Sequence, residues 1–86
     1  MYIIQFTPRA DKDIEHVPVN IQKYIRKKLD SNAALPNPNV RAEPPINLPP
    51  STHRFRIGKY RASFHVEENR IIIDRIEIRG SAYQRH

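Results

Sequence analysis

The first third of the chain alternates between strand and helix patterns. Residues 2–6 place apolar side chains at every second position and predict a short strand. Thr7 is suited to end that strand and to cap a helix with Pro8 at its first position, which continues to residue 17. After the interruption at Pro18, apolar side chains recur at intervals of three and four and predict a second helix over residues 21–29, built on Ile21, Tyr24, Ile25 and Leu29.

The last third reads as a run of strands. Turn signals at Gly58-Lys59 and Glu68-Asn69 divide residues 53–78 into three apolar-rich stretches, as in an antiparallel meander. The final stretch, residues 71–78, is apolar enough to be buried on both faces and predicts a central strand. Together the elements predict one α+β domain over residues 1–86, with two N-terminal helices packed on one face of a small, mostly antiparallel sheet.

A proline-rich segment separates the two halves. Residues 36–50 contain six prolines in fifteen positions, a density that removes amide donors and favours extended backbone. We expect a stiff connector over the surface, anchored by Val40, Ile46 and Leu48. A loop that docks a partner is the alternative interpretation of the same composition.

Composition limits the chemistry that the chain can support. Its 86 residues include no cysteine, which excludes disulfides, thiolate metal sites and a cysteine nucleophile, and the four histidines lack metal-ligand spacing. We therefore expect neither a metal nor a cofactor. No apolar run approaches the ~20 residues of a membrane span, and no signal peptide pattern opens the chain, so we expect a cytoplasmic protein without a membrane partner.

Positive charge is concentrated in the C-terminal part. The net charge is +6, and residues 53–86 carry eight cations, seven of them arginine, against four acids. A guanidinium offers a planar fork of donors that matches phosphate oxygens. Strand alternation places Arg54 and Arg56 on the face opposite Phe55, and Arg61 on the corresponding face of the next strand, so these arginines could form one basic surface facing away from the helices. Solvated outer-face residues remain the alternative.

Three segments resemble the RelE/ParE superfamily of toxins from type II toxin–antitoxin modules. They read YIIQFTPRADKDIE, HRFRIGKYRASFHVEENRIIIDRI and IRGSAY. The resemblance covers nearly the entire chain, and its most specific part is RFRIGKYR. It implies a small α+β toxin of the cytoplasm that a cognate antitoxin protein neutralises.

The RelE branch of that superfamily implies an activity. Its members cleave translated messenger RNA on the ribosome by attack of the 2′-hydroxyl, without a metal ion, so ribosome and messenger RNA become expected partners. By position, the resemblance assigns substrate binding and stabilisation of the reacting phosphate to Arg54, Arg56, Arg61, Arg79 and Tyr83. Preorganised arginines suit the charge of a pentacovalent phosphate, and Tyr83 would stack on a base.

The chain departs from that pattern at the groups that move protons. Ile78 stands where many relatives have a histidine, and arginines stand where others have a lysine or glutamate base. The candidates for proton transfer in their place are His53, Lys59 and His65. His53 is ranked first because it directly precedes the arginines and its ordinary pKa lies near neutrality.

Two other functions stay open from the sequence. The ParE branch inhibits DNA gyrase by protein contact and is not an enzyme, so the missing histidine would be expected there. A basic nucleic-acid-binding module without activity is the third interpretation.

Overall fold

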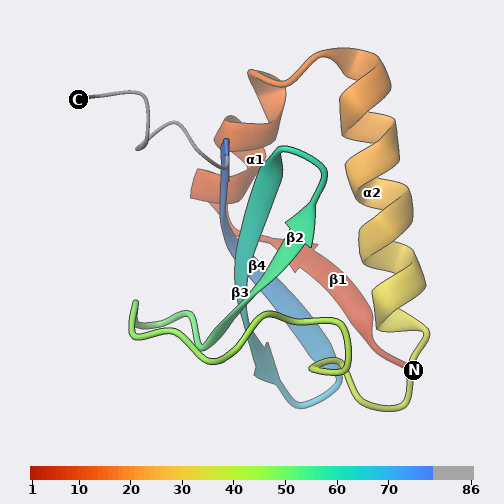
Figure 1. Ribbon diagram of the computed structural model, residues 1–86, viewed down its shortest axis with the longest axis vertical. Coiled ribbons are helices and arrows are strands. Elements are labelled where there is room, and N and C mark those ends of the chain that lie inside the picture. Colours follow the sequence, from red (N-terminus) through yellow and green to blue (C-terminus); the bar gives the residue numbers. More distant parts are fainter. Residues whose placement is uncertain (79–86) are drawn as a thin grey trace.

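The computed structural model describes residues 1–78, in which the elements follow the predicted order (Figure 1). One strand and two helices precede the connector, and three strands follow it. The elements are β1 (Ile3–Phe6), α1 (Pro8–Glu15), α2 (Val19–Ala33), β2 (His53–Ile57), β3 (Tyr60–Glu67) and β4 (Arg70–Ile78).

The four strands form one sheet in the order β1-β4-β3-β2. β1 runs parallel to β4, whereas β4 with β3 and β3 with β2 are antiparallel. The prediction of a mostly antiparallel sheet is confirmed. β4 lies in the middle with Ile71, Ile72 and Ile73 buried, which confirms the predicted central strand.

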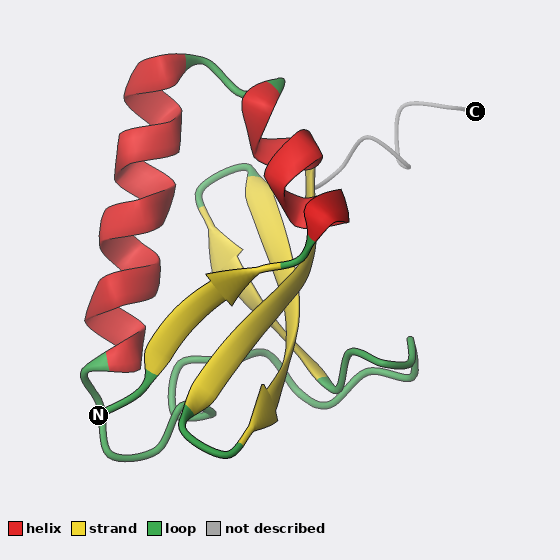
Figure 2. Cartoon of the chain, turned by 180° about the vertical axis from the view of Figure 1, so that it is seen from behind, coloured by secondary structure: helices red, strands yellow, loops and turns green. Residues whose placement is uncertain are grey.

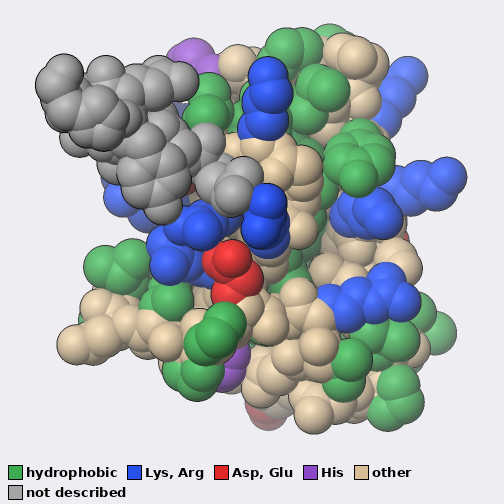
Figure 3. Space-filling view, in the orientation of Figure 1, with side chains coloured by type: hydrophobic (Ala, Val, Ile, Leu, Met, Phe, Trp, Pro, Cys, Tyr) green, Lys and Arg blue, Asp and Glu red, His purple; other side chains and the backbone are tan. Residues whose placement is uncertain are grey.

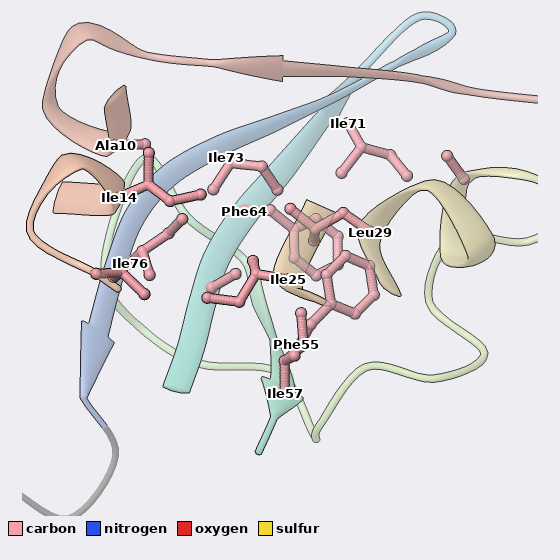
Figure 4. Close-up of a cluster of buried hydrophobic side chains, with 13 residues drawn as sticks. Ala10, Ile14, Ile25, Leu29, Phe55, Ile57, Phe64, Ile71, Ile73 and Ile76 are labelled. Atoms are coloured by element: carbon pink, nitrogen blue, oxygen red, sulfur yellow. The ribbon is translucent and has the colours of Figure 1, made fainter. Parts of the chain in front are cut away.

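The sheet separates an apolar layer from a polar one. In Figure 2, α1 lies in front of the strands and the connector passes behind them. Phe55 and Phe64 stack with ring centroids 4.1 Å apart at the centre of the layer between sheet and helices (Figure 4). Side chains from both helices complete this core: Ala10, Ile14, Ile25, Leu29 and Ala33.

α1 fixes the end of β4 that extends beyond β1. The Thr7 hydroxyl caps α1 by accepting from the Ala10 N–H and also donates to the backbone carbonyl of Asp74, at 3.1 Å in each case. The Asp13 carboxylate accepts the N–H of Ile76 at 2.9 Å. These side chains replace the strand partner that β1 is too short to provide.

Several boundaries and anchors differ from the prediction. α1 begins at Pro8 behind the Thr7 cap, as predicted, but ends two residues earlier, and α2 extends beyond its predicted range at both ends. Tyr24 was expected in the core but is 46% exposed, because it lies at the edge of α2 beside the β2–β3 turn.

The connector forms no helix or strand, as predicted, but its anchors are different. Val40 and Leu48 are exposed and Ile46 is half-buried. Short bridges attach the connector instead, at Ala42 to Phe55 and within the turn from Leu48 to Ser51. No helix in residues 1–78 has the length and apolar character needed to cross a membrane.

Candidate nucleic-acid interface

The arginines of β2 and β3 share the outer face of the sheet, which is the face turned away from the helices. Arg56 lies directly opposite Arg61, and Arg54 lies opposite Ser63. Their neighbours Phe55 and Ala62 point into the core, so alternation puts the arginines outside. Figure 3 shows Lys and Arg side chains gathered over the sheet with an acidic side chain among them.

Glu43 of the connector lies against two of these arginines. Ala42 pairs with Phe55, and the Glu43 N–H donates to the Arg54 carbonyl at 2.8 Å, so the connector here follows the edge of β2. Glu43 Oε1 then lies 3.3 Å from Arg61 Nε and 3.9 Å from Arg54 Nε. Two guanidinium groups from adjacent strands thus converge on one carboxylate oxygen; we call Arg54 and Arg61 the arginine pair.

The contact between Glu43 and the arginine pair is ionic but poorly hydrogen-bonded. The three side chains are only 24–26% exposed. Within residues 1–78, Glu43 Oε1 and both Nε atoms are shielded from solvent and have no hydrogen-bond partner. Desolvated donors without partners are costly and unusual in folded proteins. The arginine pair therefore keeps two Nε donors that no hydrogen bond satisfies within residues 1–78.

A bulge in β4 adds a carboxylate to the same face. Ser63 pairs with Arg75 and Phe64 with Ile73, which leaves Asp74 as the extra residue between them. The extra residue puts two consecutive side chains, Asp74 and Arg75, on the outer face, where strict alternation would place only one.

Asp74 is the centre of a buried polar network. Its Oδ2 accepts from the Ser51 hydroxyl at 2.6 Å and lies 2.8 Å from His65 Nδ1, while His65 Nε2 lies 3.1 Å from Glu67 Oε2. Burial of the imidazole lowers the pKa of His65, but the hydrogen bonds to Asp74 and Glu67, together with their charges, outweigh burial and raise that pKa above its usual value. The network attaches the end of the connector to β3 and β4.

The structure brings together only some of the predicted site residues. Arg54, Arg56 and Arg61 share one face. His65 is on that face too, but four residues along β3 from Arg61, about 13 Å at the usual strand rise. Its two ring nitrogens already face carboxylates.

The other two proton-transfer candidates lie elsewhere. His53 alternates with the arginines, and its ring stacks on the core residue Phe64 at a centroid distance of 5.9 Å, on the opposite face. Lys59 is in the β2–β3 turn and lines a groove with Tyr24 of α2. Arg79 and Tyr83 lie outside the described residues.

Glu43 and Asp74 were not singled out as site residues from the sequence. Glu43 is the only acid between residues 34 and 52, and a single acid in a stiff proline-rich segment is a usable signal. Asp74 interrupts an apolar run predicted to be buried on both faces. A charge in such a strand needs partners, and that requirement could have identified it.

Comparison with known proteins relates the whole fold to toxin–antitoxin systems. A family model described as ParE toxin of type II toxin-antitoxin system, parDE, matches residues 4–83. No curated protein matches the chain significantly.

Three solved structures share the fold. The toxin–antitoxin complex RelBE2 from Mycobacterium tuberculosis has a TM-score of 0.77 at 21% identity, covering 93% of both chains. The chromosomal ParDE system from P. aeruginosa gives 0.71 at 17% identity, covering 92% of this chain and 97% of that one. The RelB–RelE antitoxin–toxin complex from Methanococcus jannaschii gives 0.61 at 25% identity, covering 95% and 98%.

Proposed function

We propose that this chain, which belongs to the ParE toxin family of type II toxin–antitoxin systems, is a toxin that cleaves translated messenger RNA on the ribosome, without a metal ion. One observation carries the proposal. The guanidinium groups of Arg54 and Arg61 converge on a single anionic oxygen and leave their Nε donors without hydrogen bonds within residues 1–78. A bridging phosphate presents oxygens that would fill those donor positions.

The arginine pair would act on the phosphate during cleavage. The 2′-oxygen attacks phosphorus, the bond to the 5′-oxygen breaks, and the products are a 2′,3′-cyclic phosphate and a 5′-hydroxyl. Negative charge accumulates on the non-bridging oxygens in the transition state, and fixed guanidinium donors stabilise it. Arg56 would contact a neighbouring phosphate. Arg79 and Tyr83 are proposed to complete the site by binding phosphate and stacking on a base.

Glu43 is the proposed proton acceptor for the 2′-hydroxyl. A carboxylate can take up a proton, whereas a guanidinium cannot lose one. Oε1 lies beside the arginine pair, so a phosphate bound there would bring its 2′-hydroxyl close to this carboxylate. The leaving 5′-oxygen would take its proton from water.

Replacing Glu43 by glutamine separates two roles for this residue. Glu43→Gln keeps the shape but removes the base, so cleavage should fall by about 10²–10⁴-fold. Binding of an RNA with a 2′-deoxy group at the scissile position should be unchanged or tighter, because a competing negative charge is gone. Cleavage at or above the wild-type rate would show that Glu43 only competes with phosphate.

The proposed protein partner is a cognate antitoxin. Two of the solved structures with this fold are toxin–antitoxin complexes. An antitoxin with an acidic segment over the outer face would block the arginine pair by charge complementarity. We expect both proteins in the cytoplasm, where the ribosomes are, and co-expression followed by co-purification tests the pairing.

Inhibition of DNA gyrase is the second candidate function. The match to the ParE family model and the structural similarity to a ParDE system favour it. In that case the basic outer face would contact protein, and the messages would stay intact.

One experiment decides between the two candidates. Wild type, Arg61→Ala and Arg41→Ala are induced in a bacterial host, 5′-hydroxyl ends within reading frames are mapped, and gyrase supercoiling is assayed. Arg41→Ala is the matched control. It removes the same charge, but from an exposed connector residue whose side chain donates to Ser31 and not to Glu43. Cleavage by wild type and Arg41→Ala that is lost in Arg61→Ala would support the proposed ribonuclease activity. Intact messages with inhibited supercoiling would refute it.

A further inference from the structure

A cleft opens on the outer face beside the arginine pair. It encloses about 310 Å³ between the connector turn at residues 48–51 and the sheet residues Ser63, Asp74, Arg75 and Glu77. Two residues that line the cleft are strand partners of the arginine pair, Ser63 of Arg54 and Glu77 of Arg61, so the cleft is next to that pair. Ligand pockets usually measure roughly 300–1,000 Å³, and this one is at the small end.

The cleft contains an accessible acceptor with unused capacity on a largely buried residue. Asp74 is 9% exposed and lines the cleft. Its Oδ2 is occupied by Ser51 and His65, whereas Oδ1 has no hydrogen-bond partner among residues 1–78. The hydrogen bonds to Oδ2 fix the carboxylate in place. Oδ1 is therefore a fixed acceptor that suits an N–H donor from a ligand.

The lining selects the chemical class of that ligand. Arg75 and Glu77 line the cleft as an ion pair at 3.0 Å, so the carboxylate of Asp74 is left to repel a phosphate there. Within residues 1–78, no three His, Asp or Glu side chains converge as metal ligands. Leu48, Pro49 and Pro50 of the connector turn supply an apolar part of the lining. An apolar lining together with a fixed acceptor fits a flat, neutral ring that carries N–H donors.

We propose that this cleft binds the base of the nucleotide next to the phosphate held by the arginine pair. The inference rests on the proposed action on RNA and adds base specificity to it. Guanine fits best, because its N1–H and N2–H donors are adjacent and both can reach Oδ1. Uracil fits worst, because its single N–H lies between two carbonyl oxygens that the carboxylate repels.

The test is a titration of the full chain with 3′-GMP and with 3′-UMP, followed by NMR at the Ser51, Ser63 and Arg75 amides. Wild type should bind 3′-GMP about 5- to 100-fold more tightly than 3′-UMP, the range expected for a good two-donor base contact. Asp74→Asn should reduce that ratio toward one. Arg61→Ala should weaken both nucleotides equally and leave the ratio unchanged.

Several outcomes would overturn the base pocket. These are equal affinities in wild type, shifts that avoid the cleft, and a folded Asp74→Asn with an unchanged ratio. Methylguanidine bound in the cleft without nucleotide discrimination would assign it to an arginine of a protein partner. The ratio of the affinities for 3′-GMP and 3′-UMP is measured on wild type alone. Equal affinities would therefore overturn the proposal even if Asp74→Asn did not fold.

The base pocket and the proposed cleavage can fail separately. Guanine preference in a chain that cleaves no message would leave the pocket standing and refute cleavage. Cleavage whose mapped ends show no base preference would refute the pocket and leave the RNase activity standing.

Discussion

The two faces of the sheet bury different kinds of side chain. On the helix side, Phe55, Phe64 and Ile73 are almost fully buried and are apolar, so packing alone stabilises them. On the outer side, Arg54, Arg61 and Glu43 are about three-quarters buried, and their facing atoms lack hydrogen bonds within residues 1–78. Places where buried donors and acceptors lack hydrogen bonds are typically functional sites.

A similar difference occurs within the outer face. The carboxylate of Asp74 is held by Ser51 and His65 through well-formed hydrogen bonds, whereas Glu43 meets the arginine pair without any. The first carboxylate is fixed in place, and the second can exchange its partners. We infer that the Asp74 network supports the site and that the arginine pair acts in it.

The largest effect on stability should come from the helix side. Phe64→Ala removes a fully buried ring that stacks on Phe55, and it should lower the free energy of unfolding by about 3–5 kcal/mol. Val66→Ala, two residues along the same strand but exposed, serves as control in urea unfolding. Similar losses for both variants would contradict the assignment of the core.

Arg61→Ala should show the opposite behaviour. Cleavage should fall by about 10²–10³-fold, as when a transition-state donor is removed, with little change in urea unfolding. Arg56→Ala should cost less activity, because within residues 1–78 Glu43 forms ion pairs with Arg54 and Arg61 but none with Arg56. A larger loss of activity in Arg56→Ala than in Arg61→Ala would show that the site is centred on Arg56 and not on the arginine pair.

Asp13→Ala tests the link between α1 and the end of β4. It leaves the partly buried Ile76 N–H without its acceptor, so the free energy of unfolding should fall by about 1–3 kcal/mol. The exposed Glu15 of the same helix provides the control. Equal effects in Asp13→Ala and Glu15→Ala would indicate that helix charge, and not this hydrogen bond, is responsible.

The smallest effect should be the pH dependence caused by His65. Its pKa is raised in the folded chain, so its contribution to stability is complete below its unfolded pKa of about 6.5. That contribution is lost as the pH rises through the folded pKa. The unfolding free energy of wild type minus that of His65→Gln should therefore decrease between pH 5.5 and pH 8.5. A difference that increases with pH would contradict the network.

Much of the fold follows from local pattern. The period-two stretches predicted the strands, and the alternation of Arg54 and Arg56 with Phe55 predicted that the arginines share the outer face. The same alternation places His53 with Phe55 on the core side. His53 was ranked first by proximity in sequence, although the alternation already argued against it.

The rest depends on contacts between distant segments. Glu43 reaches Arg61 only because the connector runs along β2, and composition does not specify that path. Asp74 and Arg75 both face outward only because of a one-residue bulge, which strict alternation cannot predict. The assignments of Arg79 and Tyr83 stay predictions, since both lie outside the described residues.

The most direct test of the central claim observes the arginine pair itself. The Nε–H resonances of Arg54 and Arg61 are followed by NMR while the chain is titrated with an RNA that has a 2′-deoxy group at the scissile position. Both resonances should shift together, with one dissociation constant, as phosphate replaces Glu43. RNA binding that leaves both resonances unchanged would contradict the account.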